Sequence, residues 1–390
     1  MMILPDRRIS RARFLIPMPK REWMPSSQAI PLDDLGNKVI RTRFRLRARA
    51  HDGHIVWCGW FEDREDADAF LFALVCGSLR IERNLWRLPT PAWHPDLGEG
   101  LVYDFVTQTA LTITGSNQTY TSPSDWDNGN NSIECIGGGA SGAFGANGVH
   151  YTGGGGGSYS KITNFAFAVP GTTTSTYRVA ASIVEAQATG ANAGTNGEPT
   201  WWNSATNPGV GTDNSKCSAA GGSAGQTATG SVGGGAGGAT TASWGQTKFA
   251  GGRGGNLTGA SGLLASGGGG AAGPNGAGGN GVDSASTTNS TVTAGGQGGN
   301  GSGGAAGNNS AGGNGTDLDG SNGSGGGGGG RMITPGYAGG NYGGGGGGDR
   351  GTSITGGGQG GTGMQGIILV TYTPGVANPV FATNLAMMGL

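Results

Sequence analysis

The stretch from Gly137 to Gly363 consists mostly of glycine, yet two strand-like segments bracket it. The chain has 88 glycines in 390 residues, and only 8 of them precede residue 135. Glycine loses the most backbone entropy on folding and has no side chain to bury, so composition alone favours a disordered linker. The brackets, Asn131–Ile136 and Gly366–Pro374, are instead rich in strand-forming residues. If these two segments pair, they close the glycine-rich stretch into one folded body.

Glycine runs can fold by packing side by side as polyproline II strands. This conformation has three residues per turn and directs its N–H and C=O groups outward. Because glycine has no Cβ, neighbouring strands can approach closely enough to bond to one another. Collagen is excluded, since there is no Gly-X-Y period and the chain has only 16 prolines. We therefore predict a glycine-rich β/polyproline II distal domain over residues 131–374.

The first 97 residues predict a compact α+β domain. Arg41–Ala50 alternates with period two, which is typical of a strand, and Ile55–Trp60 follows after a turn as its hairpin partner. Acidic residues begin the segment 62–77, apolar residues recur there at helical spacing, and glycine ends it, so we expect a helix. A third strand is expected over 79–88.

The remaining boundaries follow from changes in composition. Residues 98–130 predict a β-rich connector, and residues 375–390 form a short, mildly apolar tail that could dock on a neighbouring chain. Within the glycine-rich domain, Tyr159–Val169 and Thr176–Val184 are expected to form a hairpin, because Pro-Gly lies between them.

The sequence predicts no enzyme, no cofactor and no metal site. Gly-x-Gly-x-x-Gly patterns are inevitable in this composition, and no helix pattern follows them, while the dipeptide Gly-Lys of a Walker A motif is absent. His51, His54 and Cys58 lack a fourth ligand for zinc. Asp317 and Asp319 lack the further oxygen donors that calcium requires.

The cysteines and the chain's hydropathy also exclude several classes. The four cysteines are far apart and form no C-x-x-C pair, so we interpret them as small buried residues. No segment has the length and apolar character of a membrane span, and the N-terminus lacks the pattern of a signal peptide. We therefore expect synthesis and folding in the cytoplasm, without membrane insertion.

Two aromatic groups are candidates for ligand binding. Trp201, Trp202 and Asn203 lie in a glycine-poor stretch, and Tyr337 and Tyr342 lie between the last two six-glycine runs. Aromatic faces beside amides suit sugar recognition. The alternative is that these rings fill gaps between glycine strands, and both interpretations remain open at this point.

Four groups of landmark residues follow one another along the chain. They are Trp126 with Ile133–Gly139, Gly153–Gly157 leading into Ser158–Lys161, Pro170–Thr172 before Thr176–Val179, and Ile367–Pro374. In the order of these landmarks, the chain resembles the glycine-rich domain of bacteriophage tail fibres and adhesins. The similarity covers about residues 117–374. One departure is Ala180–Ile183, where the family usually has Gly-Ala-Gly-Gly.

The resemblance implies a virion structural protein: a tail fibre, spike or tail-tip adhesin whose distal loops bind a host surface receptor, possibly a polysaccharide. It also implies a homotrimer, assembled in the host cytoplasm and located in the virion. A capsid-attached head fibre or decoration protein is a structural alternative. A polysaccharide depolymerase is a weaker one, because it would need paired acidic residues and few acids lie between Gly137 and Gly363.

Arginines occupy one face of the strand that begins at residue 41. This positive stripe is either a solvated surface or a virion-docking surface for an acidic partner. The first 100 residues hold 13 Asp and Glu beside 16 Lys and Arg, which argues against binding to nucleic acid. We expect the partner to be another virion protein of the tail or capsid. The residues are Arg41, Arg43, Arg45, Arg47 and Arg49.

Overall fold

The structure is a computed structural model that describes residues 41–49, 55–61 and 102–374, except for 146–148, 189, 259–263, 284–292, 332–334 and 351–357. Of residues 41–49, 55–61 and 102–105 it describes the backbone alone. The strands are β1 (Arg41–Arg49), β2 (Ile55–Phe61), β3 (Val102–Leu111), β4 (Gln118–Thr121), β5 (Asn131–Ile136), β6 (Phe144–Gly145), β7 (His150–Tyr151), β8 (Tyr159–Thr163), β9 (Thr174–Arg178), β10 (Thr200–Trp202), β11 (Cys217–Ala219), β12 (Thr227–Ala228), β13 (Thr247–Phe249), β14 (Asp349–Arg350) and β15 (Ile367–Tyr372). Two short 3₁₀ turns, η3 (Thr240–Ala242) and η4 (Gly299–Gly301), lie among them.

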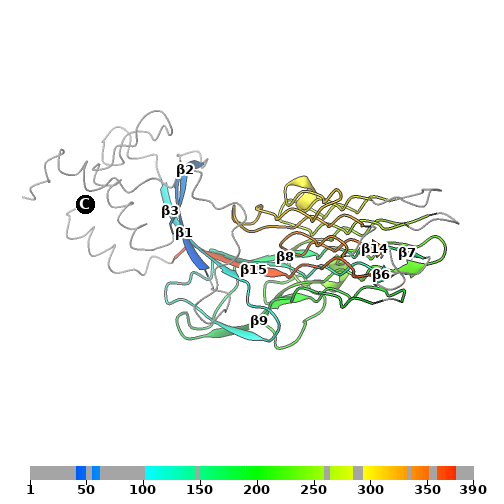
Figure 1. The fold of residues 1–390 in the computed structure, drawn as a ribbon. Coiled ribbons are helices and arrows are strands. Elements are labelled where there is room, and N and C mark those ends of the chain that lie inside the picture. The colour runs from blue at the N-terminus through cyan, green and yellow to red at the C-terminus, as the bar shows by residue number, and fades with distance from the viewer. Residues whose placement is uncertain are drawn as a thin grey trace, which may run out of the picture.

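A seven-stranded antiparallel sheet forms one end of the described structure, in the order β13-β8-β5-β15-β3-β1-β2 (Figure 1). The two strands that bracket the glycine-rich stretch lie side by side within it. Ile367 of β15 is opposite Ile136 of β5, and Tyr372 is opposite Asn131. The predicted pairing of the bracketing segments is therefore confirmed. It brings residues more than 230 positions apart in the chain into one sheet.

The prediction of a separate α+β anchoring domain at the N-terminus is wrong. β1 and β2 form the expected hairpin, but β1 also pairs along its whole length with β3 and so extends the sheet of the glycine-rich region. The described residues contain no α-helix. The helix and third strand expected over 62–88 lie outside the described residues. A two-stranded hairpin is marginally stable alone, and joining the larger sheet satisfies the second edge of β1.

A four-stranded sheet, in the order β11-β10-β9-β4, packs against the first sheet. The hairpin expected between β8 and β9 does not form, because β8 belongs to the seven-stranded sheet and β9 to this second one. After β8, Asn164 takes a left-handed conformation with φ 57°, and Phe165 and Phe167 of the connection are buried in the shared core. Burial of these two rings between the sheets outweighs the local preference for a hairpin. The rest of this core is Leu111, Trp126, Ile133, Cys135, Ile162, Tyr177, Val179, Trp202, Cys217, Ala219, Ile368, Val370 and Tyr372.

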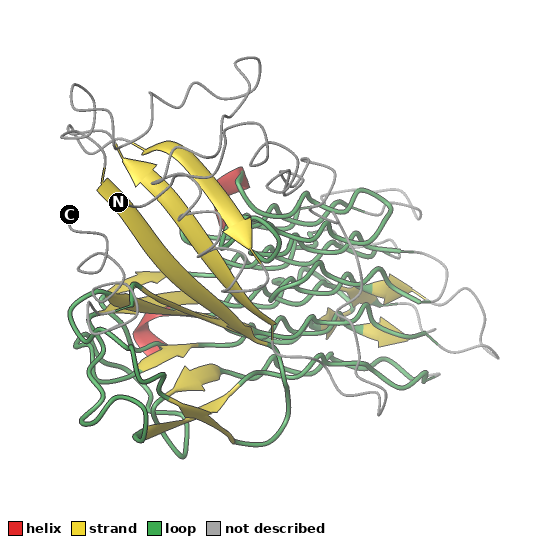
Figure 2. Cartoon of the chain, turned by 90° about the vertical axis from the view of Figure 1, so that its left-hand side faces the viewer, coloured by secondary structure: helices red, strands yellow, loops and turns green. Residues whose placement is uncertain are grey.

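Beyond the two sheets, the glycine-rich segments run side by side as a bundle, drawn as green traces in Figure 2. Gly153–Gly157 shows how they bond. Its N–H groups and that of Ser158 donate to neighbouring segments in rotation: Gly154 and Gly157 bond to one neighbour and Gly155 and Ser158 to a second. A period of three is that of polyproline II geometry. The six surrounding segments are 137–142, 220–226, 234–238, 251–255, 267–272 and 343–348.

This packing leaves no room for side chains on the inner segments. A Cβ on Gly155 would lie 2.0 Å from the carbonyl oxygen of Ala236, and one on Gly156 would lie 2.1 Å from that of Gly270. Both neighbours are backbone atoms that are themselves hydrogen-bonded within the bundle, so they cannot move aside cheaply. Glycine is therefore required here by close approach of the backbones rather than by an unusual dihedral angle.

We expect Gly156→Ala to reduce the free energy of unfolding by about 2–3 kcal/mol, because the added methyl group overlaps the Gly270 carbonyl. Gly230→Ala is the matched control, since a Cβ at Gly230 would meet no atom within 4 Å. It should change the free energy of unfolding by less than about 1 kcal/mol. Chemical denaturation of the two variants measures the difference. Equal stability of both variants would contradict the close packing.

Candidate functional site

The five residues predicted to bind a receptor do not form one site. Trp201 and Trp202 lie on β10 in the four-stranded sheet, and Asn203 follows them directly. Tyr342 packs in a second core cluster beneath the other sheet, and Tyr337 lies toward the opposite end of the glycine bundle. The structure therefore separates them into three places, and each has to be considered by itself.

Trp202 is a core residue. Its side chain is 0% exposed, and it stacks on Tyr177 with ring centroids 6.2 Å apart. Tyr120, at 5.1 Å, and Phe165, at 5.8 Å, pack against it at steeper angles. Because it is fully enclosed between the sheets, the prediction that Trp202 contacts a receptor is wrong. Its role is to fill the gap between the sheets.

Trp201 and Asn203 are also occupied by contacts within the protein. Trp201 is 4% exposed, and its Nε1 donates to the Ser204 carbonyl at 3.0 Å, so its predicted receptor contact is wrong as well. Asn203 ends β10 in a left-handed conformation, with φ 58°, and its Nδ2 donates to the Ser215 carbonyl at 2.9 Å. Asparagine tolerates this conformation better than most residues, so Asn203 serves a turn.

The two tyrosines differ from one another. Tyr342 is 3% exposed and packs with Ile136, Tyr159 and Ile367, and its buried hydroxyl has a pKa raised by desolvation. This burial overturns its predicted receptor contact. Tyr337 is half-buried, and the guanidinium of Arg331 lies over its ring at 4.8 Å from the centroid. Of the five candidates, Tyr337 is the one that lies near the end of the bundle away from the seven-stranded sheet.

We define the distal end as the end of the glycine bundle that lies away from the seven-stranded sheet, where β6, β7 and β14 are labelled in Figure 1. Bridges and short strands join neighbouring segments there, including those between β12 and β7, between β14 and β6, and between Ala188 and Gly358. Two described turns also lie at this end: 229–231 directly follows β12, and 308–310 bonds to Gly329 through the Ser310 carbonyl. Chain turns therefore gather here on top of an ordered bundle.

Polar side-chain contacts also join described residues at the distal end. The guanidinium of Arg253 donates twice to the carboxylate of Asp283, at 2.6 and 2.8 Å, and the backbone N–H of Asn256 also donates to Asp283 at 2.8 Å. The hydrogen bonds from Arg253, together with that from Asn256, lower the pKa of Asp283. Nearby, Arg331 donates to the Pro335 carbonyl at 3.1 Å. These contacts hold the described residues of the distal end in place.

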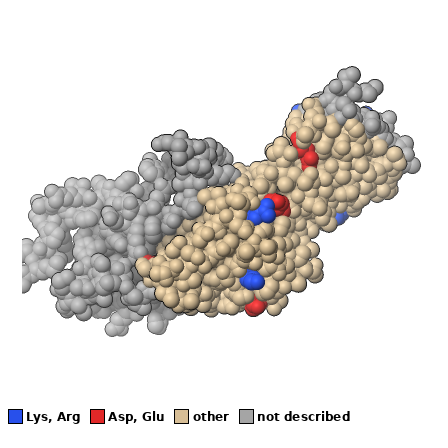
Figure 3. Space-filling model, turned by 90° about the horizontal axis from the view of Figure 1, so that it is seen from below, with Lys and Arg blue, Asp and Glu red and all other residues tan. Residues whose placement is uncertain are grey.

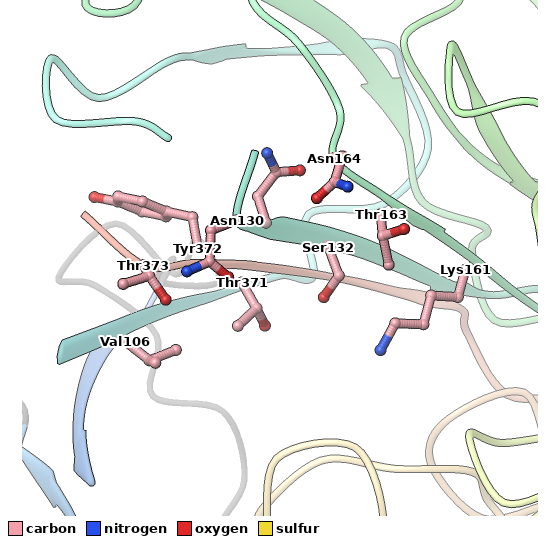
Figure 4. Close-up of a pocket in the computed structure, with 10 residues that line it drawn as sticks. Val106, Asn130, Ser132, Lys161, Thr163, Asn164, Thr371, Tyr372 and Thr373 are labelled. Atoms are coloured by element: carbon pink, nitrogen blue, oxygen red, sulfur yellow. The ribbon is translucent and has the colours of Figure 1, made fainter. Parts of the chain in front are cut away.

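A second candidate is a polar depression of about 320 Å³ on the seven-stranded sheet (Figure 4). It lies on the face that points away from the core between the two sheets. Ser132, Thr371 and Lys161 project toward it from three strands. Among its described lining residues the only charged side chain is Lys161, which already pairs with Glu134 at 3.0 Å. The depression offers hydroxyl and amide groups but no acid–base pair for catalysis.

The strand of the predicted arginine face is next to the strand that supplies Val106. Arg45 is opposite Val106 and Arg43 is opposite Gln108 in the backbone pairing of β1 with β3. Val106 lines the depression. The side chains of β1 are not described, so the docking role of its arginines stays a prediction.

The acidic pair Asp317 and Asp319 has a structural role. Asp317 accepts hydrogen bonds from the backbone and hydroxyl of Ser324, at 2.7 and 2.8 Å, and Asp319 accepts them from Ser321 and Asn322. Each carboxylate thus caps its own turn. Over the described residues no group of three or more metal-ligating side chains comes together, and none of the helices there could span a membrane. Figure 3 shows scattered charges on one face of the molecule.

No protein-family model matches the chain, and no curated protein matches it.

We expect Trp202→Ala to reduce the free energy of unfolding by about 3–5 kcal/mol, because it empties the space between the two sheets. Tyr337→Ala should cost only about 1 kcal/mol, since it removes mainly the contact with Arg331. Thermal or chemical denaturation measures both. An unchanged stability of the Trp202 variant would show that this ring is not a core element.

The contribution of the Arg253–Asp283 pair to stability should depend on pH in a defined direction. The folded pKa of Asp283 is depressed, so its contribution is fully present above about pH 4, the pKa of an unpaired aspartate, and is lost as the pH falls through the folded value. Asp283→Asn should therefore lower stability slightly at pH 7 and have a smaller effect at pH 2. Denaturation curves at the two pH values test this, and an equal effect at both would be inconsistent with the ion pair.

Proposed function

We propose that this protein is a bacteriophage virion protein, a tail fibre, spike or tail-tip adhesin, which binds the host cell surface through the distal end of its glycine bundle. The proposal takes the phage context from the similarity in the order of landmarks over residues 117–374. The burial of Trp201 and Trp202 supports the distal end over the predicted tryptophans as the place of binding.

The gathering of chain turns at the distal end supports this proposal. Every neighbouring segment beneath them is joined to others by backbone hydrogen bonds, such as Gly154 to Gly346 and Gly155 to Ser223, both at 2.9 Å. Turns presented by an ordered scaffold are the usual location of binding residues, because sequence can change there without disturbing the core. Holding the bases of the turns in place also reduces the entropy lost on binding.

The end of the molecule where the two sheets pack together, here called the sandwich end, is suited to attachment to the virion. The core residues there are enclosed, and the strand that carries the arginine face joins the central sheet along its whole length. A strand bonded on both edges can transmit attachment forces into the sheet through many hydrogen bonds. In this proposal the arginine face docks on an acidic surface of another virion protein, and the distal end points outward.

We expect Arg331→Ala to reduce binding of the purified full-length protein to bacterial cells by about tenfold, as for a residue near an interface centre. Lys216→Ala is the matched control: Lys216 lies over the ring of Trp244 at 5.1 Å, an equivalent cation–aromatic contact, but beside the four-stranded sheet. It should change binding less than twofold. Fluorescently labelled protein and a panel of bacterial strains serve as the assay.

The opposite ranking of these two variants would place the receptor site at the sandwich end and would contradict the proposal. Production of shorter chains from purified surface polysaccharide of a bound strain would show that the protein is a depolymerase and not a simple binder. Circular dichroism of both variants confirms that a loss of binding does not come from unfolding.

A further inference from the structure

Two cysteines far apart in the chain meet in the core between the two sheets. Cys135 lies on β5 of the seven-stranded sheet and Cys217 on β11 of the four-stranded sheet, and both side chains are 0% exposed. The sulfur of Cys217 lies 3.5 Å from the Ser160 carbonyl oxygen and 3.7 Å from that of Ile133. Both cysteines are free thiols in this structure.

The strand register places the Cys217 sulfur over the neighbours of Cys135. Cys135 is directly opposite Ser160 in the pairing of β5 with β8, and Ile133 is two residues before it, on the same face of β5. The Cys217 thiol thus sits above the part of the sheet that carries Cys135. Burial raises the pKa of the Cys135 thiol, and the neighbouring Cys217 thiol raises it further. Two cysteines that face one another across a core can form a disulfide where their Cα and Cβ atoms come close enough.

We propose that Cys135 and Cys217 form a redox-modification site that closes into a disulfide linking the two sheets when the protein meets a small-molecule disulfide such as oxidised glutathione. The inference rests on the geometry of the core and does not depend on the proposed function. It adds a covalent link between segments that backbone hydrogen bonds do not join directly.

The reaction is a thiol–disulfide exchange in two steps. One cysteine thiolate attacks oxidised glutathione, forms a mixed disulfide and releases one glutathione, which takes up a proton. The second cysteine thiolate attacks the sulfur of the first, forms the protein disulfide and releases the second glutathione. The protein loses two protons and two electrons, and the oxidant gains them as two thiols.

Burial keeps this site reduced until the core opens locally. It raises the pKa of the Cys135 thiol, so little thiolate is present at neutral pH, and no solvent reaches the sulfur. β11 offers the route of access, because it has three residues and lies at the end of its sheet. On its other side Ser218 exchanges two backbone hydrogen bonds with Trp244, and its hydroxyl donates to the Gly209 carbonyl. Brief opening of so short a strand would expose Cys217 without unfolding the sheet.

Peptide mapping of the full-length protein tests the proposal. After incubation with oxidised glutathione, alkylation of the remaining thiols and digestion with trypsin without reductant, we expect a peptide of residues 88–161 joined to one of residues 217–248. Cys58 and Cys76 lie on other tryptic peptides, so the assignment is unambiguous. The reaction should speed up as the pH rises from 7 to 9. A thiol whose pKa is raised becomes increasingly ionised over this range, and the thiolate is the reacting form.

A change in thermal stability provides an independent readout. Closing a loop of this length should raise Tm by roughly 5 °C or more, and a reductant should reverse the rise. Cys217→Ser should abolish both the joined peptide and the rise in Tm, while the double variant Cys58→Ser, Cys76→Ser should keep both. The proposal is overturned if both thiols remain alkylatable after long oxidation, or if each carries its own glutathione.

Discussion

The structure depends on hydrogen bonds between glycine backbones that approach one another too closely for any Cβ. At Gly156 the space that a side chain would need is filled by the carbonyl of Gly270, and Gly154 donates to Gly346 across another contact. Each inner segment can therefore have six neighbours instead of the two that a strand has in a sheet. The entropy that glycine loses on folding is offset by satisfying nearly all of its backbone polar groups in a densely packed interior.

The bundle has few large apolar side chains of its own, and the sheets compensate for this. The core between the sheets gathers the aromatic rings of Trp126, Phe165, Phe167, Tyr177 and Trp202, which bury far more apolar surface than glycine can. β5 and β15 lead directly into and out of the bundle, so this core also sets the relative position of its first and last segments. The two parts are therefore continuous: the sheets bury the apolar side chains, and the bundle extends from them.

Sequence patterns predicted the local elements well where one strand or one pair sufficed. The alternation in 41–50 predicted β1, and the bracketing segments predicted the pairing of β5 with β15. The separate α+β domain was wrong because alternation indicates a strand but not which sheet receives its edges, and β3 lies beyond the expected domain boundary. The candidate site was wrong at Trp201, Trp202 and Tyr342 for a related reason. A large ring in a polar, glycine-rich stretch looks exposed until the opposing sheet is known.

By itself the sequence determined that the chain must bury glycine against glycine. The glycine-rich stretch has few large apolar side chains to fill a core, and only glycine permits backbones to come so close. It also determined the two strands that enclose this region. Only the tertiary structure decided which runs are neighbours, since every glycine run presents the same donors and acceptors and none carries a side chain to specify a partner. The same holds for Cys135 and Cys217, which the packing of two sheets brings to the same part of the core without any signal in their spacing.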